Sequence, residues 1–152
     1  MSDPAEIYNW RRLDERLTTS GQPTEPQLQA LAALGVRHVV NLGLHTHEKA
    51  LADEAGSVAG LGMTYTHLPV DFQNPTAADL EAFYETMDRL GDEVVHVHCI
   101  ANFRVSAFFY RYRVDVLGWP ETEARADLDA VWRPEGVWQA LVDRPPGVAD
   151  AL

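Results

Sequence analysis

Short β-branched runs alternate along this chain with segments that carry helix-start and helix-stop signals. The three clearest runs cover residues 36–42, 63–70 and 94–98, and a helical pattern separates each run from the next. Strands that alternate with helices of about 10–15 residues form βαβ units, in which the strands run parallel. The alternation therefore predicts an α/β fold, with a central, mostly parallel sheet of four to five strands flanked by helices.

The helix boundaries rest on capping residues. Thr24 and Gln27 have the spacing of a capping box, and Gly35 is placed to end the helix that they start. Asn74-Pro75-Thr76 is a second start signal, and Gly91 closes its apolar stripe. The further segments in which we expect helices are 47–59, 105–117, 121–132 and 135–142.

Length and composition indicate a single globular domain. The chain has 152 residues, of which 46% are hydrophobic and 23% charged. We expect one domain over residues 1–152, with its core at about 9–117, a helical C-terminal part at 118–144 and a frayed tail at 145–152.

The charge balance excludes two classes of partner. Twelve basic against 23 acidic residues give a formal charge of -11, whereas binding to nucleic acid or to an anionic membrane requires a basic face. No secretory signal is visible at the start, so we expect a cytoplasmic protein. The single cysteine, Cys99, excludes an internal disulfide framework and would remain a thiol there.

Cys99 occupies a position that suits anion chemistry. It follows the strand 94–98 and precedes the helix expected from Val105, and ligands gather at the carboxyl ends of strands in open α/β sheets. The N–H groups of the intervening residues and the helix dipole favour an anion or a thiolate. Arg104 adds a planar, permanently charged fork that matches a phosphate.

These residues resemble a known catalytic loop. The phosphate-binding loop of the protein tyrosine phosphatase superfamily resembles the sequence Val97-His98-Cys99 followed by Asn102, Arg104 and Ser106. The segments 19–24, 39–42 and 68–71 resemble its small bacterial tyrosine-phosphatase-like (dual-specificity-like) family, which is sometimes fused to metallo-β-lactamase-type hydrolases. The resemblance implies a tyrosine-phosphatase-like fold.

The resemblance also implies a two-step hydrolysis of phosphomonoesters. Cys99 would attack phosphorus to give a cysteinyl-phosphate, which water then hydrolyses. Arg104 would hold the phosphoryl oxygens, and Asp71 would be the general acid. Ser106 would donate to the departing thiolate, and His98 would order the loop from beneath. The loop residues expected to contact the substrate are Ile100, Ala101, Asn102, Phe103 and Val105.

One spacing departs from the family pattern. Five residues separate cysteine from arginine in the superfamily, but only four separate Cys99 from Arg104, and Val105 stands before Ser106. One step along a helix rotates a side chain by about 100°. Arg104 is therefore expected to face the site only if the loop has a different shape. Asn102 replaces a glycine, and asparagine tolerates left-handed backbone geometry.

Two alternatives to phosphatase activity follow from this spacing. A Cys-x4-Arg loop also resembles that of rhodanese sulfurtransferases, so the chain could be a sulfur-transfer or persulfide-handling enzyme using Cys99. A catalytically silent module that binds an anion or a partner with the same fold is the third reading. Asp79 and Asp92 are weaker candidates for the acid than Asp71 because of their places in a helix and beside a turn glycine.

We expect no cofactor and no metal. Two pairs of histidines could supply imidazole ligands, His45 with His47 and His96 with His98. No acidic residue at helical spacing and no second cysteine completes either pair. The expected substrate is a phosphorylated protein or a small phosphoester. The sequence does not indicate which of them it is, nor the oligomeric state.

Overall fold

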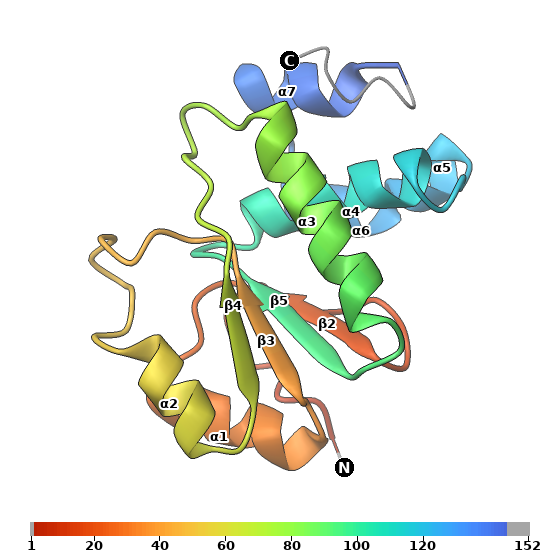
Figure 1. Ribbon diagram of the computed structural model, residues 1–152. Helices are drawn as coiled ribbons and strands as arrows, with labels where there is room; N and C mark the ends of the chain where they lie inside the picture. The colour runs from red at the N-terminus through yellow and green to blue at the C-terminus, as the bar shows by residue number, and fades with distance from the viewer. Residues whose placement is uncertain (1, 146–152) are drawn as a thin grey trace.

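A five-stranded sheet forms the centre of the computed structural model, which describes residues 2–145 (Figure 1). The strand order is β1-β2-β5-β3-β4. Only β1 runs antiparallel, against β2. The strands are β1 (Arg11–Arg12), β2 (Leu17–Ser20), β3 (His38–Asn41), β4 (Thr64–His67) and β5 (Val95–His98). The predicted α/β architecture with a mostly parallel sheet is confirmed.

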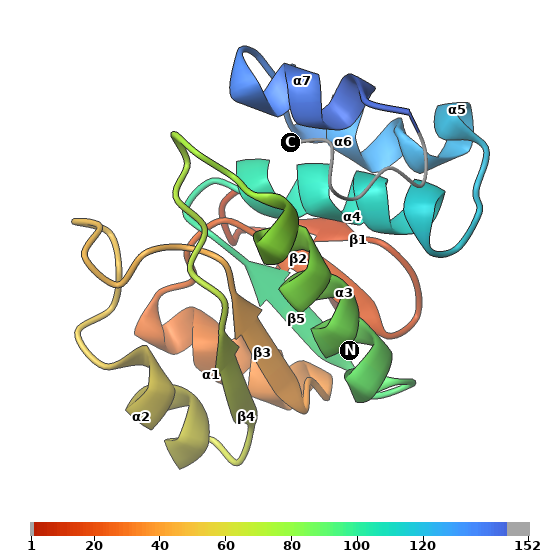
Figure 2. The ribbon, with the colours of Figure 1, turned by 45° about the horizontal axis from the view of Figure 1, so that its top comes forward.

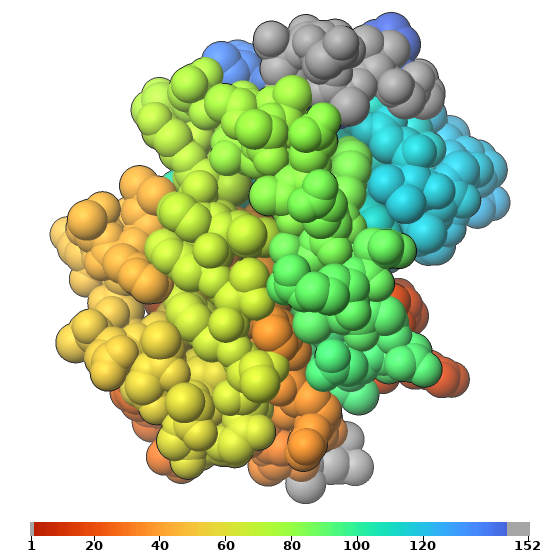
Figure 3. All heavy atoms as spheres, in the orientation of Figure 1, coloured from red at the N-terminus to blue at the C-terminus, as the bar shows by residue number. Residues whose placement is uncertain are grey.

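Helices cover both faces of the sheet, as Figures 1 and 2 show together. They are α1 (Glu25–Leu34), α2 (Glu54–Gly60), α3 (Ala77–Leu90), α4 (Phe103–Asp115), α5 (Glu121–Ala124), α6 (Ala126–Val131) and α7 (Val137–Asp143). The helix that starts at the Thr24 capping box and ends at Gly35 is confirmed. In the space-filling view, α3 and the segment leading to it from β4 cover much of the front of the molecule (Figure 3).

Each face of the sheet has its own hydrophobic core. Val39 packs with residues of α1 and α2, whereas its neighbour Val40 packs with α3 and α4, because side chains alternate along a strand. Both valines are fully buried. The sheet is therefore covered on both sides, which is the usual state of parallel strands.

Two expected boundaries were wrong. The helix expected over 47–59 begins only at Glu54, where Asp53 caps it by accepting from the Gly56 N–H at 3.1 Å. Residues before Asp53 form turns instead. The helix expected from Val105 begins two residues earlier, at Phe103.

Strand β2 was missed altogether, because its Leu-Thr-Thr-Ser sequence is too polar to stand out as a buried strand. All four of its residues are nevertheless buried. The hydroxyls of Thr18 and Ser20 are both 2.8 Å from ring nitrogens of buried His96. Polar side chains thus fill this part of the sheet by satisfying one another.

The C-terminal part is helical as expected, although 121–132 is divided into α5 and α6. Figure 2 shows these helices and α7 stacked over α4. The expected frayed tail lies outside the described residues from 146 onward. No helix within residues 2–145 is long and apolar enough to cross a membrane.

Candidate active site

Cys99 lies at the carboxyl end of β5, the strand between β2 and β3. Its side chain is fully buried, and its N–H donates to the Ser20 carbonyl at 3.4 Å. The register aligns Ser20, Asn41 and His98 across the three strands. The segments that follow these strands therefore meet around the cysteine.

Three successive carbonyl groups of the Cys99 loop accept hydrogen bonds from outside it. His98 Nδ1 lies 2.9 Å from the Cys99 carbonyl oxygen, and the Gln22 N–H donates to that of Ile100 at 3.0 Å. Asn9 Nδ2 donates to that of Ala101 at 2.8 Å. These bonds fix the orientation of the peptide groups in the loop.

The N–H groups of the same loop have no such partners. Within residues 2–145, no hydrogen bond uses the N–H of any residue from 100 to 105, and the first one used after them is that of Ser106, which donates to the Asn102 carbonyl. Asn102 has φ 68° and ψ 7°, the left-handed geometry expected of it, and helix α4 begins with the next residue. The loop thus offers unpaired donors at a helix N-terminus, an arrangement that binds anions.

Arg104 belongs to this site despite the shorter spacing. Its side chain is buried, and Nε donates to the Val70 carbonyl at 2.9 Å. Its guanidinium lies over the Phe72 ring, 5.2 Å from the centroid. No hydrogen bond or ion pair among residues 2–145 uses its two Nη atoms. Arg104 lines a hollow of about 320 Å³ together with His47, Phe72, Ile100, Ala101 and Phe103.

Asp71 lies on the loop that Arg104 holds. Its side chain is exposed, and Oδ1 accepts from the Gln73 N–H at 2.9 Å. The cap of α3 is Thr76, which accepts from the Asp79 N–H at 3.1 Å. Asp71 therefore does not cap this helix, whereas Asp79 has a structural role in the capping box.

His98 forms a buried pair with Glu54, the first residue of α2. Nε2 and Oε2 are 2.5 Å apart, and both side chains are almost inaccessible. Burial opposes ionisation of Glu54, but the hydrogen bond and charge of His98, with a hydrogen bond from Gln22, outweigh it and hold the pKa of this carboxyl below its ordinary value. Both His98 ring nitrogens lie within hydrogen-bonding distance of oxygen atoms, the Cys99 carbonyl on one side and the Glu54 carboxylate on the other, so the ring is held in place beneath the loop.

Glu54 and Gln22 are site residues that sequence reasoning missed. Gln22 donates to Glu54 Oε1 at 2.9 Å through its side chain and to the Ile100 carbonyl through its backbone. Glu54 therefore supports the loop through two routes, His98 and Gln22. An acidic residue at a helix start gives no sequence signal for this role, since such residues usually face solvent.

Gly21 is required by the close approach of the loop. A Cβ atom at this position would lie 2.5 Å from the Ile100 carbonyl oxygen and 2.9 Å from Tyr8 Cδ2. Only glycine lets the two backbones pass at this distance. The segment 19–24 carried the family resemblance, but the structural reason for its glycine appears only in the folded chain.

Ser106 does not have the partners expected of it. Its Oγ donates to the Phe103 carbonyl and accepts from Trp132 Nε1, both at 3.1 Å. No hydrogen bond to Cys99 is present among the described residues. Ser106 keeps the distance from Cys99 that the resemblance implies, but its hydroxyl faces the C-terminal helices, and these bonds give it a structural role. Val105 is fully buried, and its N–H is among the unpaired N–H groups of residues 100–105 in the described chain.

The histidine pairs do not form a metal site. Within residues 2–145, no group of three or more His, Cys, Asp or Glu side chains could hold a metal ion. His45 stacks on His67 with ring centroids 3.7 Å apart. His96 is fully buried, and its desolvation holds its pKa well below 6.5. His47 lines the hollow beside Arg104.

A family model described as "Polymorphic toxin system, DSP-PTPase phosphatase" matches residues 16–105. The chain belongs to this family. The match spans β2 to the start of α4, and so includes Asp71, Cys99 and Arg104. Ser106 and the C-terminal helices that follow it lie beyond residue 105, where this match ends.

Solved structures agree with the DSP-PTPase assignment. A putative phosphatase (DUF442) from Shewanella putrefaciens CN-32 is 35% identical, with a TM-score of 0.83 over 91% of each chain. TpbA of P. aeruginosa, solved in complex with pTyr, is 18% identical, with a TM-score of 0.65 over 93% of this chain and 91% of its own. This second likeness shows the shared fold. The tyrosine-phosphatase-like fold implied by the sequence is therefore confirmed.

Curated relatives of this DSP-PTPase domain are longer proteins. A "Beta-lactamase hydrolase-like protein" of Agrobacterium fabrum is 29% identical over 101 residues, which are 64% of this chain and 23% of the relative. One from Xylella fastidiosa is 30% identical over 95 residues, 60% of this chain and 22% of its own length. The chain thus spans about a quarter of the length of these relatives.

Proposed function

We propose that this protein is a cysteine-dependent phosphatase that hydrolyses phosphomonoesters through a cysteinyl-phosphate on Cys99. One observation carries the proposal: the carbonyls of residues 99–101 are tied outward while the N–H groups of residues 100–105 remain unpaired. A ring of donors of this kind suits the three equatorial oxygens of a phosphoryl group. Arg104 adds two Nη donors and a positive charge at the hollow that it lines together with Ile100 and Ala101 of this loop.

In the first step, Cys99 Sγ attacks phosphorus as a thiolate, forming the S–P bond as the bond to the leaving oxygen breaks. Asp71 gives its proton to that oxygen. In the second step, a water attacks phosphorus and loses a proton to Asp71. The S–P bond then breaks, which releases inorganic phosphate and restores the thiolate.

The surrounding residues act on this chemistry by positioning. His98 donates to the Cys99 carbonyl and is itself held by Glu54, so it fixes the backbone of the nucleophile from beneath. Asn9 and Gln22 hold the loop in the shape that leaves its N–H groups free. These bonds exist before substrate binds, so little reorganisation is needed during the reaction.

The test compares two activities of the wild-type protein and Cys99→Ser. We expect the wild type to hydrolyse p-nitrophenyl phosphate and the variant to be inactive while still binding phosphate. Turnover that survives Cys99→Ser would contradict the nucleophile assignment. Thiosulfate–cyanide sulfur transfer without phosphate turnover would favour the rhodanese-like alternative, and phosphate binding with neither activity would favour the silent anion-binding module.

A further inference from the structure

An aromatic groove of about 680 Å³ adjoins the Cys99 loop. Its apolar lining consists mostly of four side chains, Phe72, Phe103, Trp132 and Val137, and Trp138 completes it. Phe72 and Phe103 also line the hollow that holds Arg104. A molecule whose phosphoryl group lies in the loop therefore meets this groove as it extends past the two phenylalanines.

The walls of the groove are fixed before any ligand binds. The rings of Phe103 and Trp132 stack with centroids 4.4 Å apart and planes 5° apart. Trp138 Nε1 donates to the Phe72 carbonyl at 2.8 Å, which fastens the Asp71 loop to α7. Val137 is 49% exposed, so apolar surface remains uncovered by the described chain. A preformed apolar groove binds a side chain at a low entropic cost.

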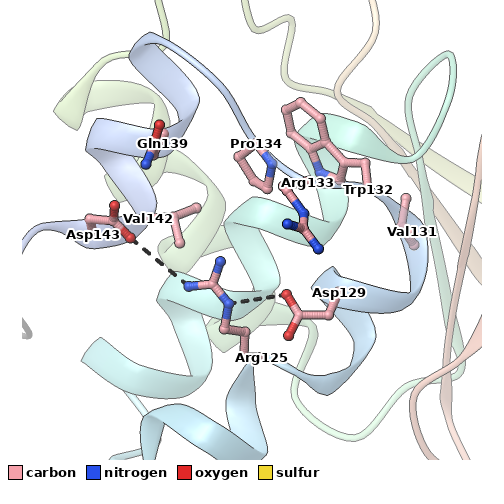
Figure 4. A pocket seen from close by; sticks show the side chains of 9 residues that line it. All are labelled: Arg125, Asp129, Val131, Trp132, Arg133, Pro134, Gln139, Val142 and Asp143. Carbon is pink, nitrogen blue, oxygen red and sulfur yellow. Dashed lines mark hydrogen bonds and ion pairs between the residues drawn. The ribbon is translucent and has the colours of Figure 1, made fainter.

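A second hollow, of about 600 Å³, shares Trp132 with the aromatic groove and is less suited to a ligand (Figure 4). Its cation, Arg125, already forms ion pairs with Asp129 at 3.0 Å and with Asp143 at 3.9 Å. Arg133 lines both hollows and has no carboxylate within 4.0 Å among residues 2–145. Figure 4 shows the Arg133 guanidinium on the side of this second hollow, close to Arg125 and Asp129.

We propose that the groove binds a large apolar side chain flanking the phosphorylated residue of a peptide substrate. The proposal rests on the phosphatase function and names its substrate class. Gln73, Arg133 and Glu135 are exposed lining residues that suit the N–H and C=O groups of a peptide better than an acyl chain. The formal charge of -11 also opposes approach to an anionic membrane, so the peptide is favoured over a lipid.

One wall of the groove lies beyond the residues that the family model matches. The family model ends at residue 105, whereas Trp132 and Val137 follow it. The loop and Asp71 belong to the shared region, and the C-terminal helices supply the opposite wall. Catalysis and choice of peptide are thus assigned to different parts of the sequence.

The test measures peptide binding by Cys99→Ser, which keeps the fold and does not turn over its ligand. Two five-residue phosphotyrosine peptides differ only in whether phenylalanine or alanine flanks the phosphotyrosine. We expect the phenylalanine peptide to bind roughly tenfold more tightly, as partial burial of an aromatic side chain provides. Hydrolysis of both peptides by the wild type is measured separately.

A matched pair of variants locates the effect. Val137→Asp, made in the Cys99→Ser background, places a charge in the groove and should reduce the affinity ratio of the two peptides to near one. Val116→Asp changes a valine of equal exposure outside the groove, at 50%, and should keep the ratio. Comparing ratios removes any common loss of folded protein.

The outcomes separate the two proposals. Equal affinity for both peptides would overturn the groove assignment even if both are hydrolysed. A phenylalanine preference without hydrolysis would support the groove and contradict the phosphatase function. Dodecyl phosphate that competes better than the phenylalanine peptide would overturn the peptide assignment in favour of a lipid.

Discussion

Arg104 Nε donates to the carbonyl of Val70, which directly precedes Asp71, across 2.9 Å. Arg104 and Asp71, the two proposed catalytic side chains, are 33 positions apart in sequence. A single hydrogen bond from Arg104 to the backbone next to Asp71 therefore connects them. A rotated arginine is accommodated because its Nε bonds to the neighbouring loop, leaving both Nη atoms for a phosphoryl group. The shorter Cys-to-Arg spacing is thus compatible with an anion site.

Replacing Arg104 with lysine should cost activity although it retains the charge. A lysine has no bidentate fork. Its single ammonium group also cannot replace the guanidinium, which donates to the Val70 carbonyl through Nε while its Nη atoms face the phosphoryl group. We expect kcat/KM for p-nitrophenyl phosphate to fall by about 10²–10³, the usual cost of a lost oxyanion donor. Arg37→Lys, at an exposed position before β3, is the control. Equal activity of the two variants would remove Arg104 from the mechanism.

Replacing Asp71 with asparagine should have an effect that depends on the leaving group. Phenyl phosphate needs a proton on its departing oxygen, and we expect kcat to fall by about 10²–10³ for it. The loss for p-nitrophenyl phosphate should be much smaller, because nitrophenolate leaves readily. Exposed Asp92→Asn serves as the control. A loss of the same size for both substrates would argue against proton donation by Asp71.

Gly21→Ala tests the shape of the loop. The added Cβ would meet the Ile100 carbonyl oxygen at 2.5 Å, so the loop must shift. We expect a loss of about 1–3 kcal/mol in the free energy of unfolding, with a clear loss of p-nitrophenyl phosphate turnover. Gly60→Ala is the matched control, since no heavy atom lies within 4 Å of its added carbon. Unchanged activity in Gly21→Ala would show that the loop tolerates displacement.

Glu54→Gln tests the buried pair through pH. The folded-state pKa of Glu54 lies below its ordinary value of 4.5, so its ionised form stabilises the fold above pH 4.5. That contribution is lost as the pH falls through the folded-state pKa. We expect Glu54→Gln to be less stable than the wild type at pH 7, by about 1–3 kcal/mol, and the difference to narrow in acid.

Urea unfolding followed by tryptophan fluorescence at pH 7, 4 and 3 measures this difference. Glu85→Gln, on the exposed face of α3, should follow the wild type at each pH. A constant deficit of Glu54→Gln at all three values would mean that charge plays no part in the pair. Loss of turnover in the variant would further indicate that the pair positions the loop.

The parts of the fold that sequence predicted are those fixed by local chemistry. Thr24 and Gln27 form the expected capping box, and Gly35 ends the helix with φ 108°. The strand before Cys99 and the left-handed Asn102 likewise follow from local preference. These features depend on residues within a few positions of one another, which is the range that sequence patterns describe.

The features that escaped prediction depend on residues distant in the chain. Glu54 lies 44 positions from His98, and their pairing needs α2 to start at the residue that follows its cap, Asp53. The partners of Ser106 follow from a tryptophan on the C-terminal segment. No local pattern specifies such pairs, because they are decided by how helices pack on the finished sheet.

The central place of β5 also sets when the site can exist during synthesis. Strands β2 and β3 are made first, yet they pair with β5 rather than with each other. The bonds from Asn9 and Gln22 to the loop likewise wait for residues about 80–90 positions later. Contacts this distant in sequence form late in folding. A nascent chain that ends before β5 therefore lacks both the strand that joins β2 to β3 and Cys99 itself, so the two halves of the sheet and the candidate site are assembled by the same strand.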